Sequence, residues 1–356
     1  MRKLFTPVLF IFIALNGFSQ QFVSFSNKHI AYEGRIAFTG DAAELMWPGT
    51  SITINFTGTG ISGIFKDQDT SNYYNIILDK DSIYTIQFDT LKETVSLAEG
   101  LPYGKHSLQL FKRTEWDKGK TWFYGFVKNP DSKLLKRDKL PKRKIEFFGN
   151  SITCGYAIND MAGDSPTGYY ENNYDSYAAI TARHFKAQYH CTSKSGIGIM
   201  VSWFPLIMPE MYNRLDPTDS SSKWDFSKYT PDVVVINLFQ NDSWIINMPD
   251  NEQFKKRFGT KAADSNQIVD AYKNFVQTIR TTYPKAQIIC MLGNMDITKK
   301  GSPWPGYVQK AVNELHDQKI VTFFAPYKNT GGHPKVKEQA AMANGLIQFI
   351  DEHIKW

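Results

Sequence analysis

Cysteine is scarce in this chain. Its 356 residues include three cysteines, Cys154, Cys191 and Cys290. An odd number at wide spacing matches neither a disulfide framework nor the paired ligands of a zinc site. We interpret the three as small buried residues. The scarcity therefore excludes a small disulfide-rich fold and gives no sign of a structural metal.

Long apolar runs are also missing after the first residues. No later stretch of about 18 or more apolar residues occurs, so we expect no transmembrane helix. The chain begins with Arg2 and Lys3, continues with an apolar stretch over Leu4–Leu15, and then offers small residues for cleavage in Gly17–Ser19. This pattern is typical of a secretory signal peptide, and no cysteine follows that could carry a lipid anchor. We expect residues 1–20 to be a signal peptide and the protein to be secreted or periplasmic, without membrane contact after cleavage.

A large excess of charge of one sign is absent as well. The formal net charge is +6, and 42% hydrophobic with 14% aromatic residues is enough for packed cores. Basic residues gather in Lys133–Lys144, interrupted by Asp138 and Pro141. This cluster is either a polyanion site or a solvated linker, and the linker is the favoured interpretation. We expect no nucleic-acid partner.

The pattern of polar and apolar residues divides the chain after residue 20 into two parts. Residues 21–132 alternate polar and apolar residues in short segments, such as Ser51–Phe56 and His106–Phe111, with turn signals between them. This alternation predicts an all-β sandwich of jelly-roll type. Residues 133–143 are the predicted linker to the second part.

Residues 144–356 read differently, because apolar strand-like runs alternate with helical patterns. The runs lack alternation, so both faces of the predicted sheet are buried under helices, as in an open parallel α/β domain. The predicted strands are Lys144–Phe148, Gln188–Cys191, Asp232–Leu238, Ala286–Met291 and Ile320–Phe324. The predicted helices are Ser176–Lys186, Ser265–Thr281, Tyr307–Gln318 and Lys335–Ile354.

The first candidate for chemistry is Ser151. The segment Gly149-Asn150-Ser151 ends the first predicted strand in a tight turn, which would present the serine as a nucleophile at the carboxyl edge of the sheet. Most serines after such a turn are helix caps or turn residues, so Ser151 alone is weak evidence. A serine hydrolase also needs a base and an oxyanion hole.

Three further segments after strands supply these parts. Gly196, within Ser195–Gly198, allows close approach of a backbone N–H to an oxyanion, although a plain turn explains it equally. Asn241 could donate from its carboxamide, although an Asx turn is the alternative. His333, in the loop before the last helix, could act as general base. The order serine, glycine, asparagine, histidine across successive strand ends is far more specific than any one member.

This constellation resembles that of the SGNH, or GDSL-like, hydrolases. Over nearly the whole chain after the signal peptide it is similar to carbohydrate esterase family 2. The similar segments are Phe38–Gly60, Asn75–Asp79, Leu110–Glu115, Ile145–Gly155, Ser195–Ile199, Met208–Glu210, Pro231–Leu238 and Cys290–Gly293. The resemblance implies an α/β fold with a flavodoxin-like parallel sheet and helices on both faces, preceded by the jelly-roll sandwich.

The resemblance also implies a serine esterase that needs no metal and no organic cofactor. Ser151 would attack an acetyl carbonyl and His333 would take its proton. The backbone N–H groups of Ser151 and Gly196 and the side chain of Asn241 would form the oxyanion hole. The substrates implied are O-acetyl groups of plant polysaccharides such as xylan and glucomannan, so the expected partner is an acetylated polysaccharide or oligosaccharide.

Three departures from the family pattern affect the expected site. Asn150 replaces the usual aspartate before the serine, and because asparagine suits tight turns we expect the turn to survive. Phe239 replaces a glycine before the oxyanion donor, which would narrow the site or line an acyl pocket. No acid lies three residues before His333, where Thr330 stands. We therefore predict a Ser-His dyad whose histidine is oriented by the backbone carbonyl of Thr330 or Gly331.

Aromatic residues near predicted strand ends are candidate substrate contacts. Trp244 is the first choice because it lies three residues after the predicted oxyanion donor, and Trp203, Trp304 and Phe239 are further candidates. Core packing is the alternative for Trp203 and Trp304. The long acidic loop Ile158–Asp175 either covers the site or is a solvated insertion.

Two other functions remain open from the sequence. One is an esterase for a different acetylated glycan, such as pectin, peptidoglycan or a host glycan. The other is a weakly active or inactive glycan-binding protein, which the three departures favour.

Overall fold

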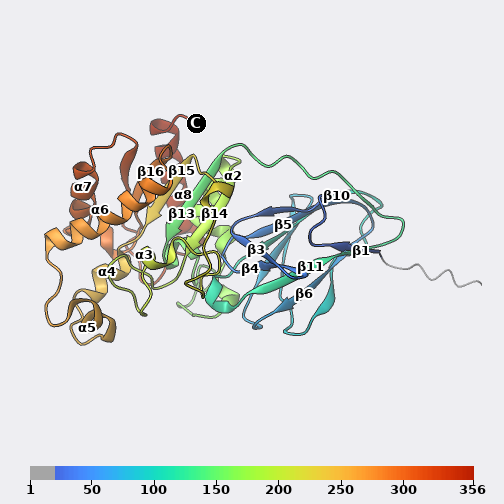
Figure 1. Ribbon diagram of the computed structural model, residues 1–356, viewed down its shortest axis with the longest axis horizontal. Coiled ribbons are helices and arrows are strands. Elements are labelled where there is room, and N and C mark those ends of the chain that lie inside the picture. The colour runs from blue at the N-terminus through green and yellow to red at the C-terminus, as the bar shows by residue number, and fades with distance from the viewer. Residues whose placement is uncertain (1–20) are drawn as a thin grey trace, which may run out of the picture.

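The computed structural model describes residues 21–356, so the predicted signal peptide lies outside the described residues. Figure 1 shows a β-rich part and an α/β part side by side, with the chain crossing between them as a long arm after β11. Within residues 21–356, no helix has both the length and the apolar character needed to cross a membrane.

The N-terminal part consists of two six-stranded antiparallel sheets. One contains β1 (Gln21–Ser24), β3 (Ile36–Thr39), β4 (Ala42–Leu45), β6 (Ile61–Asp67), β9 (Glu93–Ala98) and β11 (Thr121–Lys128). The other contains β2 (Ala31–Glu33), β5 (Ser51–Gly58), β7 (Tyr74–Leu78), β8 (Ser82–Ile86), β10 (Gly104–Lys112) and β12 (Lys133–Leu134). Alternate residues from both sheets meet in one core, as Ile54 and Phe56 of β5 do with Phe65 and Phe123. The predicted all-β sandwich is confirmed.

One segment of the predicted linker belongs to the sandwich. Lys133 and Leu134 form β12, which pairs antiparallel with Thr57 and Phe56 of β5. Such a short edge strand exists only through this tertiary pairing, and the basic composition of the segment carries no sign of it.

The second part contains a five-stranded parallel sheet in the order β14–β13–β15–β16–β17. Its strands are β13 (Lys144–Gly149), β14 (Gln188–Ser193), β15 (Val233–Asn237), β16 (Gln287–Leu292) and β17 (Ile320–Phe324). This is the flavodoxin-like order, in which the chain reverses direction across the sheet at the first strand. Because β14 and β15 flank β13, the loops after these three strands meet at one edge, where open α/β sheets bind ligands.

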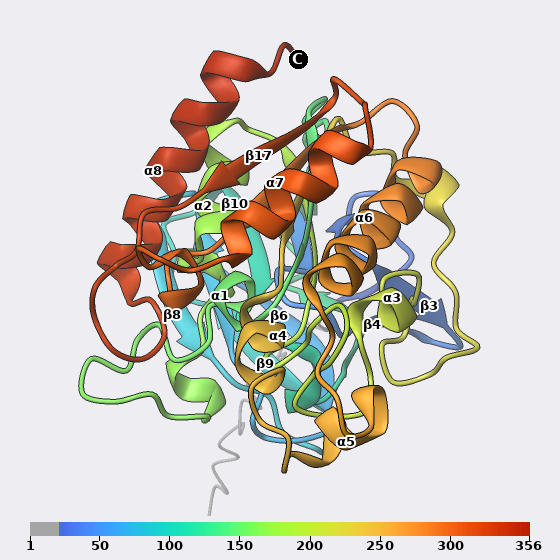
Figure 2. The same cartoon turned by 90° about the vertical axis from the view of Figure 1, so that its left-hand side faces the viewer.

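Helices cover both faces of this sheet, as predicted. One face packs against α2 (Tyr177–His184) and α8 (Val336–His353), and the other against α6 (Ser265–Thr282) and α7 (Trp304–Glu314), as Figure 2 shows from the side of α7. Successive strand residues point to opposite faces, so Phe147 joins one core and Phe148 the other. The shorter helices α1 (Ser151–Cys154), α3 (Met208–Met211), α4 (Gln240–Ile245) and α5 (Glu252–Phe258) lie in the loops.

Candidate active site

Ser151 lies where the sequence predicts it, directly after β13. Asn150 has extended backbone, and its side-chain oxygen accepts the N–H of Ile152 at 3.1 Å, so it caps α1. The helix begins at Ser151, whose side chain is held at the carboxyl edge of the sheet. Asparagine at position 150 therefore preserves the turn.

The loops after β14 and β15 bring Gly196 and Asn241 to the same edge. Gly196 has φ of +81°, a left-handed conformation that glycine adopts without strain. Among residues 21–356, the backbone N–H groups of Ser151 and Gly196 donate no hydrogen bond to another protein group. Both N–H groups are thus left without an internal acceptor at this edge of the sheet.

His333 comes to Ser151 from the loop that follows β17, the end strand of the sheet. It lies in the loop between β17 and α8, and its Nε2 is 2.8 Å from the Oγ of Ser151. The ring of Tyr156 packs against the imidazole with 4.6 Å between ring centroids. A serine hydroxyl and an imidazole nitrogen at this distance have the geometry of the nucleophile–base pair of a serine hydrolase.

A carboxylate orients the histidine, so the predicted dyad is wrong. The Oδ2 of Asp164 lies 2.6 Å from the Nδ1 of His333, and its Oδ1 accepts the backbone N–H of His333 at 3.1 Å. The backbone carbonyls of Thr330 and Gly331, which were the predicted orienting groups, instead accept hydrogen bonds from the Lys328 ammonium at 2.9 and 2.8 Å. The arrangement is a Ser-His-Asp triad.

Asp164 belongs to the acidic loop Ile158–Asp175, which covers the site through specific contacts. Asp160 accepts backbone N–H groups from three residues of the loop, Ala162, Gly163 and Ser165, and so closes a tight turn around Asp164. The Lys335 ammonium ties the loop down by donating to the carbonyls of Ala157 and Gly163, and it lies 3.4 Å from Asp164. Partial burial raises the pKa of Asp164, but the hydrogen bond and charge of His333 outweigh it and bring the pKa down to about 2.

The Asn241 side chain is held by two hydrogen bonds. Its Nδ2 donates to the carbonyl of Ile197 at 2.8 Å, and its Oδ1 accepts the indole N–H of Trp203 at 3.0 Å. The second hydrogen of Nδ2 remains for another acceptor. The backbone N–H of Trp203 also donates to the carbonyl of Gly196 at 3.1 Å, so Trp203 contacts both predicted oxyanion donors.

Asp242 fixes the neighbouring loop and was not singled out by the sequence. Its buried carboxylate accepts backbone N–H groups from Ile199, Met200 and Val201. Burial raises its pKa to about 6, against the opposing effect of these hydrogen bonds. This anchor holds the loop after β14 against α4, the helix that carries Asn241.

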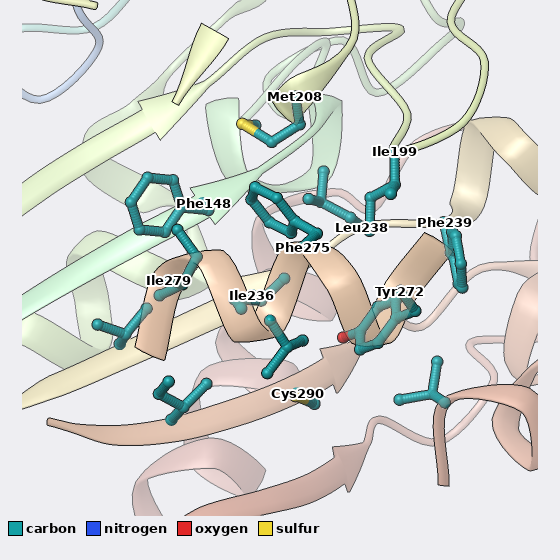
Figure 3. Packing of buried hydrophobic residues seen from close by; sticks show 14 of the residues in the cluster. Phe148, Ile199, Met208, Ile236, Leu238, Phe239, Tyr272, Phe275, Ile279 and Cys290 are labelled. Carbon is teal, nitrogen blue, oxygen red and sulfur yellow. The ribbon is translucent and has the colours of Figure 1, made fainter. Parts of the chain in front are cut away.

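The predicted aromatic contacts separate into two groups. Trp203 is 44% exposed, and Trp244 is half-buried with its indole N–H donating to Asp296 at 2.8 Å. Phe239 is fully buried and Trp304 is 6% exposed, and their rings pack together with 5.0 Å between centroids. The prediction that Phe239 and Trp304 contact substrate is therefore wrong, because both belong to the core beneath the site. Figure 3 shows Phe239 turned toward Tyr272 of α6.

Within residues 21–356, no cluster of three or more His, Cys, Asp or Glu side chains is placed to hold a metal ion. The three cysteines are free and buried, as interpreted from the sequence. Burial raises the pKa of each thiol.

Family models match most of the chain. The model of the carbohydrate esterase 2 N-terminal domain matches residues 32–137, and the model of the GDSL-like lipase/acylhydrolase family matches residues 147–345. These two matches correspond to the sandwich and to the α/β part that carries the triad.

Two individual proteins are similar in sequence to this chain over most of its length. The cellulase/esterase CelE of Acetivibrio thermocellus is 35% identical over 347 residues, which cover 93% of this chain but only 40% of the length of CelE. An acetylxylan esterase/glucomannan deacetylase of Cellvibrio japonicus is 25% identical over 345 residues and is matched over 91% of its length.

The solved structures include a similar protein of known fold. A family two carbohydrate esterase from Clostridium thermocellum in complex with cellohexaose has a TM-score of 0.80 at 35% identity, with 91% of this chain and 98% of that chain covered. The chain therefore belongs to the GDSL-like lipase/acylhydrolase family and, within it, to the family 2 carbohydrate esterases, which are ester hydrolases.

Proposed function

We propose that this protein removes O-acetyl groups from plant cell-wall polysaccharides such as xylan and glucomannan, with Ser151 as nucleophile. The observation that carries the proposal is the hydrogen-bonded line from Ser151 Oγ through His333 to Asp164. An ionised Asp164 can only accept, so the proton of the imidazole sits on Nδ1 and Nε2 is left to accept the serine proton.

The first half of the reaction forms an acetyl-enzyme. Ser151 Oγ bonds to the acetyl carbonyl carbon while its proton passes to Nε2 of His333, and the carbonyl electron pair moves onto oxygen. The N–H groups of Ser151 and Gly196 and the amide of Asn241 donate to this oxyanion, where each donor of this kind contributes about 2.7–4 kcal/mol in other serine hydrolases. The oxyanion electron pair then re-forms the carbonyl, the bond from carbon to the sugar oxygen breaks, and His333 gives its proton to that leaving oxygen, which becomes the sugar hydroxyl.

The second half releases acetate. A water molecule attacks the acetyl carbon and gives its proton to His333. The bond to Ser151 breaks, the proton returns to the serine, and acetate leaves. Asp164 stays ionised and stabilises the imidazolium formed in both halves.

The substrate class is inferred from the relatives. The Cellvibrio japonicus protein is named an acetylxylan esterase and glucomannan deacetylase, and the Clostridium thermocellum enzyme was solved with cellohexaose. We further propose that residues 1–20 direct export, because polymers of the plant cell wall lie outside the cell that degrades them.

Acetate release from acetylated xylan, acetylated glucomannan and a small aryl acetate tests the proposed substrate. We expect release from acetylated xylan or acetylated glucomannan at a rate per ester no lower than from the aryl acetate. Release only from acetylated pectin, peptidoglycan or a host glycan would replace the substrate and keep the chemistry. Binding of the polysaccharides without release of acetate from any ester would contradict the enzyme and support a glycan-binding protein.

We expect no step in the pH profile of kcat/KM that belongs to Asp164. Its pKa of about 2 keeps the carboxylate ionised throughout the neutral and mildly acidic range, so the triad is not interrupted there by loss of this charge. The depressed pKa also means that Asp164 stabilises the fold above its ordinary value of 3.8, a contribution lost as pH falls from 3.8 toward 2. The pH profile of kcat/KM checks the expectation for activity, and an acidic ionisation that disappears in Asp164→Asn would contradict it.

Trp203→Phe is expected to lower kcat by about tenfold with little change in KM. Phenylalanine keeps an aromatic ring but removes the N–H that holds the Asn241 carboxamide, and loosening a donor should cost less than losing it. Trp122→Phe is the matched control, because Trp122 donates to Glu44 within the sandwich. A raised KM for polysaccharide with unchanged kcat would show instead that Trp203 is a platform for sugar rings.

A further inference from the structure

Glu115 of the β-sandwich has a buried carboxylate that contacts the turn Ser195–Gly196 of the α/β part, which we call the oxyanion turn because it contains the Gly196 N–H. It lies between β10 and the 3-10 turn η1 (Trp116–Lys118), and its side chain is fully buried. Its Oε2 accepts the backbone N–H of Ser195 at 2.6 Å. The next peptide along the chain supplies the N–H of Gly196, so a side chain from one part of the molecule is bonded beside an oxyanion donor of the other.

The charge of this contact is balanced by Lys194. The Lys194 ammonium lies 3.5 Å from Glu115 Oε2 and 2.6 Å from Asp117 Oδ2. Burial lowers the pKa of Lys194, but the two carboxylates outweigh burial and raise it above its usual value, so the lysine is a cation. Glu115 and Asp117 of the sandwich thus contact Lys194, and Glu115 also bonds Ser195, the residue before Gly196.

Glu115 also contacts the helix that begins at the nucleophile. The thiol of Cys154, the last residue of α1, lies 3.7 Å from Glu115 Oε2. The backbone N–H of Glu115 in turn donates to the carboxyl group of Glu171, whose pKa is raised by burial and by the charge of Glu115. Glu115 therefore joins the oxyanion turn and the nucleophile helix through its carboxylate, and the loop that carries Asp164 through its backbone N–H.

The arrangement costs stability. Glu115 Oε1 is buried and has no hydrogen-bond partner among the described residues. Apolar side chains of similar volume in place of both members of a buried ion pair are commonly neutral or stabilising. A buried carboxylate that lowers the stability of the fold is better explained by a role in positioning the oxyanion turn than by a role in stabilising the fold.

We propose that Glu115 is a positioning residue, through which the β-sandwich fixes the turn that presents the Gly196 N–H to the oxyanion. This inference rests on the function proposed above for the same site. It makes the sandwich a part of the catalytic machinery, whatever glycan contacts it also provides.

Two substitutions separate the hydrogen bond from the charge. Glu115→Leu removes the acceptor of the Ser195 N–H, and we expect kcat on a small aryl acetate to fall by about 10- to 100-fold with little change in KM, since small displacements of catalytic groups have effects of this size. Glu115→Gln keeps an acceptor oxygen but makes a weaker, uncharged hydrogen bond, so kcat should fall by about two- to fivefold.

A second pair between the two parts of the molecule provides the matched control. Arg35 of the sandwich and Glu146 of β13 form a buried ion pair at 2.8 Å. Among the described residues the Glu146 carboxylate also accepts from Thr192 and Tyr283, but it bonds neither Ser195 nor Gly196. Glu146→Gln should lower the melting temperature and leave kcat close to that of the wild type. Equal losses of kcat in Glu146→Gln and Glu115→Leu at equal losses of melting temperature would show a merely structural role and overturn the proposal.

Affinity for an alkylboronic acid gives an independent readout, because its serine adduct is tetrahedral and anionic like the transition state. Glu115→Leu should weaken this affinity by the same factor as kcat/KM, and unchanged kcat and boronate affinity would overturn the proposal. If the leucine variant does not fold, Glu115→Gln decides in the same way. An inactive wild type would contradict the proposed function itself, whereas an active wild type with an unaffected Glu115 variant contradicts only the role of Glu115.

Discussion

Ser151→Ala is expected to lower kcat for acetate release by about a millionfold, the size of effect seen when the nucleophile of another serine hydrolase is removed. Without the hydroxyl no acetyl-enzyme can form, and His333 has no proton to accept from the protein. KM should change little, because the substitution removes one oxygen atom and leaves Asn150 to cap the short helix. Acetate release by wild type and variant on the same acetylated polysaccharide measures the effect.

The fold should survive this change. Ser151 is 6% exposed, and the hydrogen bond that its side chain makes to His333 belongs to the site rather than to the core. Ser165→Ala is the matched control, since Ser165 is a half-buried serine of the loop over the site that bonds Thr167. Full activity of Ser151→Ala with an unaffected control would place the nucleophile elsewhere.

Asp164→Asn should have the second largest effect, a loss of about 10²- to 10⁴-fold in kcat. In a buried triad the same change costs about 10⁴-fold because the histidine adopts the wrong tautomer. Asp164 is 35% exposed on a loop, so solvent replaces part of what its charge contributes and the lower end of the range is included. Rates on a small acetyl ester across pH check the prediction.

Another acid of the same loop provides the control for Asp164. Asp175 accepts a hydrogen bond from Asn172 and contacts no residue of the triad, so Asp175→Asn should retain activity. A wild-type rate in Asp164→Asn would mean that His333 is oriented without a carboxylate, as the sequence first suggested.

The fold was predictable because its strands are continuous in the sequence. The apolar run Ile320–Phe324 coincides with β17, and the predicted strand Asp232–Leu238 contains β15. The boundaries were missed where tertiary contacts decide them. Helix α7 begins at Trp304 rather than at Tyr307, and its first residue is buried with its ring packed on Phe239.

The site was only partly predictable. Ser151, Gly196, Asn241 and His333 each follow a strand, so local pattern and chain order suffice to bring them to one edge. Asp164 comes from a loop 169 residues before His333, and no local spacing links the two. Phe239 was misjudged because its left-handed backbone, with φ of 77°, turns the ring into the core, which composition alone does not reveal.

The most direct test of the central claim is a search for the acetyl group on Ser151. An acetylated xylan or glucomannan oligosaccharide would be mixed with the enzyme, quenched during the first turnover and digested for mass spectrometry. We predict one acetyl group on the peptide that contains Ser151, formed and lost at the rate of turnover, and none in Ser151→Ala. Acetate release by the wild type with no acetyl group on Ser151, or with one on another residue at the rate of turnover, would contradict the mechanism.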